Sequence, residues 1–333
     1  MTDFASGVSI GRHKLPNRAF LAPMAGITDA PMRRLAERFG AGLVVSEMIA
    51  SNALATGHHE MVRKLGKSGS LPHMVQLAGC EAQWMVRGAE IAAAAGADII
   101  DINMGCPAKR VTNGYAGSAL MRVPDEALKL IEAVVGATSL PVTLKMRLGW
   151  DDDCLNAADI ARRAVDAGVQ MITVHGRTRQ QFYKGEARWE LVAPVVEAVD
   201  VPVVVNGDIV DLTAARQALN RSGAAAVMIG RGAQGQPWIV GQIGAELQGV
   251  ERPETPQGDA LVDLILEHYD AMLSDYGTRV GVRVARKHLD WYLEALGIEL
   301  HKEVRKVLLG TEAPGEVIEM IPSIYGGGWR QAA

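Results

Sequence analysis

The sequence predicts a (β/α)8 barrel followed by a small all-helical domain, and three observations lead to this fold class. Short apolar runs alternate with longer amphipathic stretches from Phe20 to about Ile229. Eight runs occur within roughly 210 residues, and a barrel of this kind usually takes about 250 residues. Beyond Pro237 the apolar runs stop and only helical periodicity continues.

The eight runs have the character of strands in a parallel sheet that is buried on both faces. Each run is short, uninterrupted and often β-branched, whereas a half-exposed strand alternates apolar and polar residues. The runs are residues 20–22, 43–46, 74–78, 99–103, 142–146, 171–175, 203–207 and 226–229.

Helical periodicity fills segments between the runs, and glycine follows several of them. Glycine just after a helix supplies the left-handed cap that turns the chain back toward the sheet, as we predict at Gly168 and Gly223. An open doubly wound sheet is the alternative. A closed barrel is favoured because the eight units are similar and no large polar insertion separates them. The clearest helical segments are residues 31–39, 84–95, 125–135, 156–167 and 212–219.

The chain is predicted to divide into a barrel domain, residues 1–247, and a helical domain, residues 259–333. Residues 248–258 (QGVERPETPQG) are rich in proline, glycine and charge, which is typical of a linker. After this linker, amphipathic helices are expected at residues 261–273, 280–296 and 300–309.

Composition limits the function classes. The formal net charge is −4, so nucleic acid could be bound only through a local basic surface. The cysteines, Cys80, Cys106 and Cys154, are odd in number and form no Cys-x-x-Cys pair, which argues against a disulfide framework or a metal site. Residues 1–17 lack the apolar segment of a secretion signal, and no run is long enough to cross a bilayer. We therefore expect a cytoplasmic protein.

Catalytic groups of a barrel lie at the carboxyl ends of its strands, and glycines mark a phosphate site there. Residues 230–235 (GRGAQG) match the dinucleotide fingerprint G-x-G-x-x-G, but they follow the eighth run rather than the first, so a dinucleotide-binding fold is rejected. Barrels bind phosphate with the loops after strands seven and eight. Gly207, Gly230 and Arg231 are therefore predicted to hold one phosphate, which suits the mononucleotide FMN.

Three polar residues at strand ends are candidates for contact with a flavin ring. Lys145 could stabilise the negative charge that a reduced flavin carries near N1 and the C2 carbonyl, although a salt-bridged lysine is the alternative. Gln76 could pair with the pyrimidine edge, or it could be a satisfied core amide. His175 ends an apolar run, where a core histidine is common, but the polar residues at the other strand ends favour a role in the site.

Cys106 is the candidate acid. It lies in a Gly-Cys-Pro turn, three residues beyond Asn103, just past the fourth run. A free thiol is mostly protonated at neutral pH and can therefore serve as a general acid, although a buried cysteine is often only a small apolar side chain. Cys80 and Cys154 are expected to have no catalytic role.

Several motifs together resemble the tRNA-dihydrouridine synthase family, over nearly the whole chain. Residues 103–109 (NMGCPAK) and 46–48 (SEM) look closest to the bacterial B-type subfamily. No motif position departs from the family pattern. The other stretches are residues 21–29 (LAPMAGITD), 75–79 (VQLAG), 143–147 (TLKMR), 174–178 (VHGRT), 206–209 (NGDI) and 230–231 (GR).

The resemblance implies a barrel that binds FMN, a helical domain that binds tRNA, and NADPH as electron donor. The implied reaction reduces the C5–C6 double bond of a D-loop uridine to 5,6-dihydrouridine. Hydride passes from flavin N5 to C6, and Cys106 protonates C5 on the opposite face. Asn103 helps to hold the uracil, which must leave its base stack. The B-type likeness implies the seventeenth tRNA position. The implied FMN contacts are Pro23, Met24, Ala25, Gln76, Lys145, His175, Asn206, Gly207, Asp208, Gly230 and Arg231.

Basic residues of the helical tail are candidates for RNA contact. Between Arg279 and Lys306 there are seven basic and four acidic residues, and four of the basic ones recur at helical spacing. A solvated helix face is the alternative. We expect a monomer without membrane or metal partners. The predicted substrate contacts, besides Asn103, are Lys109, Arg177, Arg283, Arg286 and Lys287, and Arg110 and Arg179 extend this basic path.

Two other functions stay open at this point. A flavin-dependent reductase or dehydrogenase of a free pyrimidine, similar to dihydroorotate dehydrogenases, would share the barrel and the cofactor, but it would not need the basic tail for turnover. A regulatory RNA-binding protein with a vestigial barrel would be colourless when purified, whereas a flavoenzyme is yellow.

Overall fold

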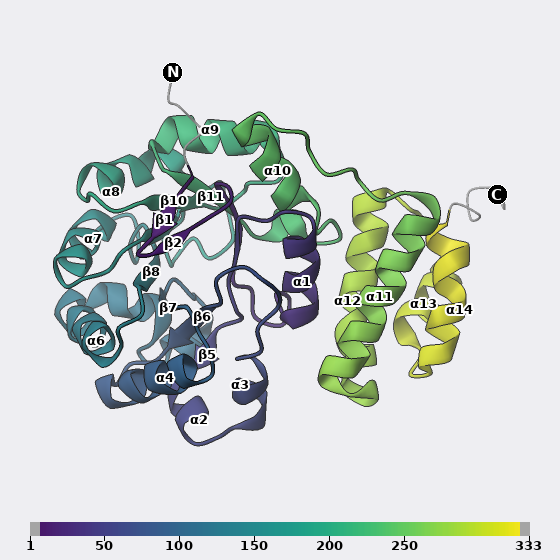
Figure 1. The fold of residues 1–333 in the computed structure, drawn as a ribbon, viewed down its shortest axis with the longest axis horizontal. Helices are drawn as coiled ribbons and strands as arrows, with labels where there is room; N and C mark the ends of the chain where they lie inside the picture. Colours follow the sequence, from purple (N-terminus) through teal and green to yellow (C-terminus); the bar gives the residue numbers. More distant parts are fainter. Residues whose placement is uncertain (1–6, 327–333) are drawn as a thin grey trace.

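Parallel strands curl into the predicted barrel (Figure 1). The computed structural model describes residues 7–326, apart from the side chain of Arg110. In this part of the chain the strand order is β4-β3-β11-β10-β9-β8-β7-β6-β5, and a bridge between Val45 and Met74 closes the sheet. Strands β4 and β5 together occupy one strand position of the barrel, so the nine strands fill eight positions and the (β/α)8 fold is confirmed. The strands are β3 (Ala19–Leu21), β4 (Leu43–Val44), β5 (Ile49–Ala50), β6 (Met74–Ala78), β7 (Ile99–Met104), β8 (Val142–Arg147), β9 (Ile172–His175), β10 (Val203–Asn206) and β11 (Ala226–Ile229).

An antiparallel hairpin, which the sequence analysis missed, precedes the barrel. It consists of β1 (Ser9–Ile10) and β2 (His13–Lys14), joined through Gly11 in the left-handed region at φ 54°. Ile10 packs in one apolar cluster with Phe20 and Val204 from the barrel strands. The hairpin therefore covers one end of the barrel core, and the amino ends of the strands face it.

The helices around the barrel follow the predicted segments, with shifts of a few residues at their ends. Asp29 caps α1 by accepting a hydrogen bond from the Met32 N–H, and Gly223, at φ 69°, ends α9 as predicted. The barrel helices are α1 (Ala30–Arg38), α2 (Ser51–Ala55), α3 (His59–Arg63), α4 (Ala82–Ala94), α5 (Lys109–Thr112), α6 (Pro124–Ala137), α7 (Ala157–Asp166), α8 (Ala193–Glu197), α9 (Leu212–Ser222) and α10 (Ile239–Gln248), with 3-10 turns η1 (Gly117–Arg122), η2 (Trp189–Val192) and η3 (Arg231–Ala233).

The sequence analysis also missed α10, because its two glycines weaken the helical pattern. The fold requires both of them. A Cβ at Gly241 would lie 1.7 Å from the Phe39 carbonyl oxygen, and one at Gly244 would lie 2.6 Å from the Asn17 side chain. Glycine is a poor helix former, but it is required at these two positions because α10 packs so closely against its neighbours.

The C-terminal helices form a second apolar cluster beside the barrel (Figure 1). Tyr269, Leu289 and Ile321 are fully buried members of it, and Leu35 and Trp238 join it from the barrel side. The predicted helices appear as α11 (Gly258–Tyr276), α12 (Thr278–Leu296) and α13 (Lys302–Gly310), and α14 (Pro314–Tyr325) is an addition. Of the described helices, none combines the length and the apolar character that a membrane span requires.

Candidate active site

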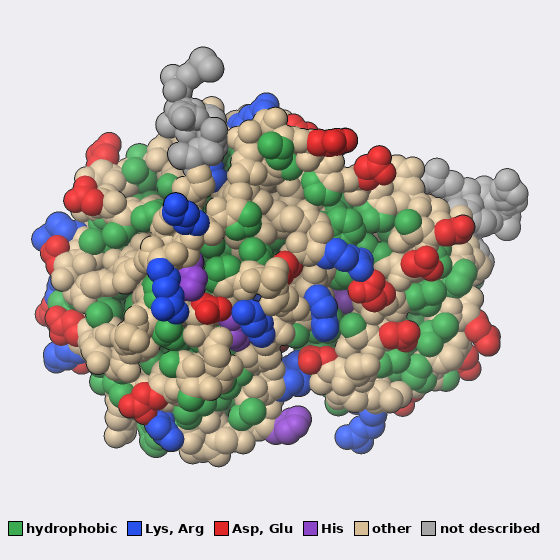
Figure 2. All heavy atoms as spheres, viewed as in Figure 1, with side chains coloured by type: hydrophobic (Ala, Val, Ile, Leu, Met, Phe, Trp, Pro, Cys, Tyr) green, Lys and Arg blue, Asp and Glu red, His purple; other side chains and the backbone are tan. Residues whose placement is uncertain are grey.

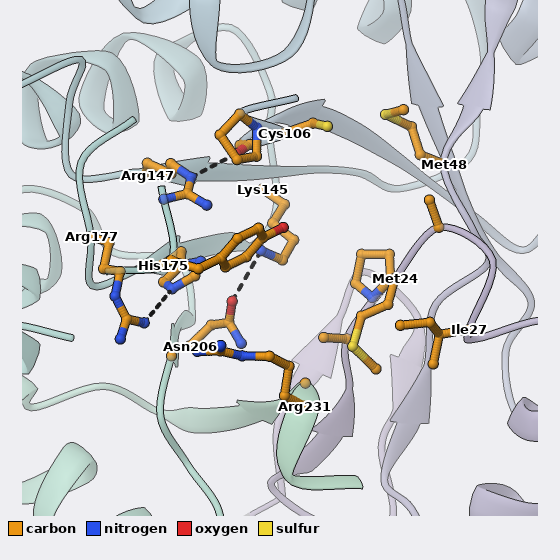
Figure 3. A pocket seen from close by; sticks show the side chains of 18 of the residues that line it. Met24, Ile27, Met48, Cys106, Lys145, Arg147, His175, Arg177, Asn206 and Arg231 are labelled. Carbon is orange, nitrogen blue, oxygen red and sulfur yellow. Dashed lines mark hydrogen bonds between the residues drawn. The ribbon is translucent and has the colours of Figure 1, made fainter. Parts of the chain in front are cut away.

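A cavity of about 650 Å³ lies at the carboxyl ends of the barrel strands (Figure 3). Small-molecule and cofactor sites usually measure about 300–1,000 Å³. All eleven residues expected to contact FMN line this cavity, and so do Asn103, Cys106 and Arg177. The structure therefore brings these fourteen predicted residues together. The other predicted substrate residues do not belong to the described lining, namely Lys109, Arg283, Arg286 and Lys287.

Lys145 is a buried cation of the cavity. Its ammonium donates a hydrogen bond to Asn206 Oδ1 at 3.1 Å, from β8 to the end of β10 (Figure 3). The pKa of Lys145 is lowered to about 8, chiefly by burial and also by the Arg147 guanidinium, while Asp101 acts against them. In the described part of the chain, Lys145 forms no salt bridge. A buried charge without a counter-ion is costly, so the cavity suits a negatively charged group.

A chain of hydrogen bonds connects the barrel interior to Cys106. The Gln76 amide donates to Asp101 Oδ2 at 2.7 Å, and the Gln76 oxygen accepts from Asn103 at 2.7 Å. Asn103 Oδ1 in turn accepts from the Cys106 N–H at 3.0 Å. Gln76 therefore has both ends of its amide engaged within the protein, as the core interpretation predicts, and it also lines the cavity. Asn103 shapes the turn that carries the thiol.

Contacts from two other segments, β8 and η1, fix the Cys106 turn. The Arg147 guanidinium donates to the Gly105 carbonyl at 2.8 Å, and the hydroxyl of Ser118 donates to the Cys106 carbonyl at 2.9 Å. Gly117 has φ 60°, and a Cβ there would lie 2.8 Å from the same carbonyl oxygen. The thiol is partly exposed and lines the cavity, whereas the other two cysteines lie outside its described lining.

Glycines shape the opposite end of the cavity for a close backbone approach. Gly207 has φ 113°, and a Cβ there would lie 2.8 Å from His175 Cδ2. Asp208 follows in the left-handed region at φ 53°. The backbone N–H groups of Gly207, Gly230 and Arg231 have no hydrogen-bond acceptor among the described residues. Free N–H groups that converge between two strand ends form an anion-binding site.

Arg177 and His175 stand behind this glycine-rich end. Arg177 is only 2% exposed, pairs with Asp208 at 2.5 Å and approaches His175 Nε2 to 3.3 Å (Figure 3). Burial lowers the pKa of His175 well below its usual range, and the cationic neighbours Arg147 and Lys145 act in the same direction. The imidazole is therefore neutral at physiological pH.

The expected site residues omitted several members of the cavity wall, among them Arg147 and Tyr183. Arg147 lies two residues beyond Lys145 in β8, so both side chains face the same way. That spacing was a usable signal. Burial lowers the pKa of Arg147 to about 10. Tyr183 comes from a loop without periodicity, and its ring lies 5.6 Å from the Arg147 guanidinium carbon and 5.4 Å from that of Arg231. Nothing in the sequence marked this tyrosine.

The predicted basic stripe of the helical domain has partners within the protein. Arg283 pairs with Glu312 at 2.9 Å, and Arg286 donates to the last carbonyl of α13 at 2.8 Å. Lys287 donates to the carbonyl oxygen of Gly26, on the barrel. On the face seen in Figure 2, acidic side chains lie along the outer edge of the helical domain, and lysines and arginines lie toward the barrel.

Sequence comparisons agree with the motifs. The family model described as "Dihydrouridine synthase (Dus)" matches residues 20–322. A "Probable tRNA-dihydrouridine synthase" of Rhodobacter capsulatus is 58% identical over 320 residues, 96% of this chain and 98% of the relative. A "tRNA-dihydrouridine synthase B" of Pseudomonas putida is 47% identical over 291 residues, 86% of each chain.

Comparisons with solved structures support the fold alone. Morphinone reductase in complex with tetrahydroNAD is similar with a TM-score of 0.52 and 14% identity, over 76% of this chain and 93% of that one. A 2-naphthoyl-CoA reductase is similar with a TM-score of 0.58 and 12% identity, over 74% of this chain and 52% of that one. At this identity the likeness concerns the barrel and not the substrate.

Proposed function

The chain belongs to the dihydrouridine synthase family, and from this premise we propose that it is a flavin-dependent tRNA-dihydrouridine synthase. Such an oxidoreductase reduces the C5–C6 double bond of a D-loop uridine to 5,6-dihydrouridine. The observation that carries the proposal is the cavity that holds both the Lys145 ammonium and the Cys106 thiol. The family match and the relatives named for tRNA favour this function over reduction of a free pyrimidine.

The glycine-rich end of the cavity fits the phosphate of FMN. The unpaired N–H groups of Gly207, Gly230 and Arg231 would bind phosphate oxygens, and the exposed Arg231 guanidinium would add charge. The backbone can come this close because Gly207 and Gly230 have no side chain. Pro23, Met24 and Ala25 would contribute the opposite wall, after β3.

Lys145, Gln76 and His175 fit the ring end of the flavin. When bound, FMN supplies the hydride that reduces C6 of the uracil. Lys145 would hold its ammonium against the electron-rich edge of the ring, where the buried positive charge is needed. His175 is neutral, so it would contribute a hydrogen bond and no charge at that end of the cavity. Asn206 orients the lysine through the 3.1 Å contact, and Asp208 would line the same wall.

Cys106 is the residue that would deliver the proton to C5. The Cys106 N–H donates to Asn103 Oδ1 and Arg147 donates to the Gly105 carbonyl, so the turn is fixed and Sγ is held at the cavity. A positioned acid of this kind contributes about 10²–10⁴ to a rate. Asn103 would also present its remaining N–H to the uracil, since one amide hydrogen already goes to Gln76.

The substrate and the electron donor follow from the family. We propose tRNA, with the seventeenth position as the target, and NADPH as the donor. In this proposal residues 1–247 form the catalytic domain, 248–258 the linker and 259–333 the tRNA-binding domain, and residues 1–6 and 327–333 lie outside the described part. Lys109, Arg177, Arg283, Arg286 and Lys287 stay predicted substrate contacts. Arg177 is the buried member of that set.

The proposed function is tested with purified protein, an unmodified tRNA transcript, and NADPH or NADH supplied separately. We expect a yellow protein with flavin absorbance, oxidation of the nicotinamide that depends on tRNA, and dihydrouridine in the digested product by mass spectrometry. Fragment mapping then identifies the position. A protein that holds flavin but leaves every D-loop uridine intact, while reducing free uracil or orotate, would overturn the proposal.

A further inference from the structure

Two arginine side chains lie over the indole ring of Trp150, at the rim of the barrel. The guanidinium carbon of Arg122, at the end of η1, is 4.8 Å from the ring centroid, and that of Arg179 is also 4.8 Å away. The three residues come from the loops after β7, β8 and β9, which the chain brings to the same end of the barrel. We call these residues the arginine–tryptophan stack.

The stack borders the wall of the cavity that carries Cys106. Arg179 reaches Thr112 Oγ1 at 3.5 Å, and Thr112 follows Val111, which lines the cavity together with Cys106. The backbone N–H of Arg179 also donates to the Gly149 carbonyl at 3.0 Å, next to Trp150. The stack is therefore held close to the turn that presents the thiol.

The two guanidinium groups of the stack lack counter-ions. Within residues 7–326, neither Arg122 nor Arg179 forms a salt bridge, and the buried Nε of Arg179 has no hydrogen-bond partner. The acids after Trp150 are engaged elsewhere: Asp152 pairs with Arg188 at 2.6 Å, and Asp151 accepts from Gln180 at 3.2 Å. Asp153 is exposed and is the remaining carboxylate of that loop.

The basic side chains of the helical domain are held differently from those of the stack. In the basic stripe of that domain, Arg283 forms an ion pair with Glu312. Arg286 donates to a carbonyl at the end of α13, and Lys287 donates to a carbonyl of the barrel. Within the described residues, the stack places two guanidinium groups without a salt bridge on the barrel rim, beside the wall of the cavity. A stacked guanidinium keeps its planar fork of donors available while its motion is restricted, so binding an anion costs little additional entropy.

We propose that the arginine–tryptophan stack binds phosphodiester groups of the RNA beside the nucleotide that enters the cavity. This inference rests on the proposed function, because it needs an RNA substrate. A base that enters the barrel must be extruded from its stack, so the phosphates on either side of it pass over the rim. Guanidinium forks bind phosphate oxygens in pairs. The rim next to the Cys106 wall is where those phosphates have to lie.

The test compares Arg122→Gln, Arg179→Gln and the double variant in binding an unmodified tRNA transcript, by fluorescence anisotropy over roughly 50–200 mM salt. We expect each single variant to weaken binding about threefold to tenfold and to reduce the salt slope by about 1. Arg122→Lys should keep the slope, since it keeps the charge. The matched control is Arg162→Gln, an exposed arginine of α7 that pairs with Asp159 at 2.7 Å.

Two results would overturn the inference. One is a double variant that binds tRNA with the affinity and salt slope of the wild type. The other is an Arg162→Gln control that loses as much affinity for tRNA as the stack variants do, because the loss would then reflect the overall charge of the protein and not the stack. Arg122 is exposed, so its variant answers the question even where Arg179→Gln is unstable. The proposed function fails separately, if the wild-type protein of the same preparation makes no dihydrouridine.

Discussion

Lys287 of α12 donates a hydrogen bond from its ammonium to the carbonyl oxygen of Gly26, in the loop after β3. The N–H of Gly26 donates to Glu47 Oε1 at 2.6 Å, and Glu47 is almost fully buried. One peptide segment of the cavity wall is therefore held from both sides, by an acid of the barrel and by a cation of the helical domain. The position of α12 and the shape of the cavity are coupled through this loop.

Replacement of Lys287 by methionine should loosen that loop. The Gly26 carbonyl loses its charged donor, so we expect the free energy of unfolding to fall by about 1–2 kcal/mol and FMN to dissociate faster. Denaturant titration and flavin fluorescence measure the two effects. The control is Arg283→Met on the same helix, whose exposed ion pair contributes about 0–1 kcal/mol. Equal effects of the two variants would contradict the prediction.

Replacement of Cys106 by alanine should remove most of the product and leave the cofactor in place. In the proposed mechanism the thiol is the proton donor, and loss of a positioned acid lowers the rate by about 10²–10⁴. Dihydrouridine is measured by mass spectrometry of the digested tRNA, and flavin content by absorbance. Cys80→Ala, at an exposed cysteine, is the matched control. Undiminished product from the Cys106 variant removes this residue from the mechanism.

Binding of FMN should weaken as the pH rises through about 8. Lys145 has its pKa lowered to about 8, chiefly by burial, so the ammonium that would face the electron-rich edge of the ring is lost above that pH in the free protein. Binding then requires proton uptake, and affinity drops by up to about tenfold per pH unit. Flavin fluorescence titration over roughly pH 6–10 measures this loss of affinity. Lys145→Met should bind FMN more weakly and without that pH dependence, and a retained dependence would refute the assignment.

Replacement of Gly207 by alanine should abolish phosphate binding. The new Cβ would lie 2.8 Å from His175 Cδ2, on a backbone at φ 113° that alanine avoids. We expect purified protein without flavin. Gly57→Ala is the control, because that glycine also has positive φ, 74°, but faces open space. If the two variants retain flavin equally, the close approach at Gly207 has no role in binding.

Acid should destabilise the helical domain through two buried histidines. Burial lowers the pKa of His268 to about 3 and that of His288 well below its usual range. The unfolded chain therefore binds more protons than the folded one below about pH 6.5, and stability is lost as the pH falls from there, by about 1.4 kcal/mol per unit for each histidine. His268→Gln should reduce the slope of unfolding free energy against pH, measured by denaturant titration. The exposed His301→Gln should leave it unchanged, and equal slopes would contradict the prediction.

Much of the fold could be predicted from the sequence because its signals are local. Apolar runs mark buried parallel strands, and Gly223 marks a helix end, wherever the rest of the chain lies. The hairpin around Gly11 is too short to show periodicity. Helix α10 carries glycines at positions where its neighbours leave no space, so its pattern is clear only when those neighbours are known.

The candidate site, like the fold, could be predicted from the sequence only in part. Sequence by itself identified the strand ends and the chemical types found there, such as Lys145 and Cys106, because a barrel gathers its strand ends at one mouth. Only the tertiary structure decided the partners. It placed Tyr183 in the cavity wall, bonded Lys287 to Gly26, and set Arg122 over Trp150 with no counter-ion among residues 7–326. Partner choice depends on distances between residues far apart in the chain, and no local pattern encodes those distances.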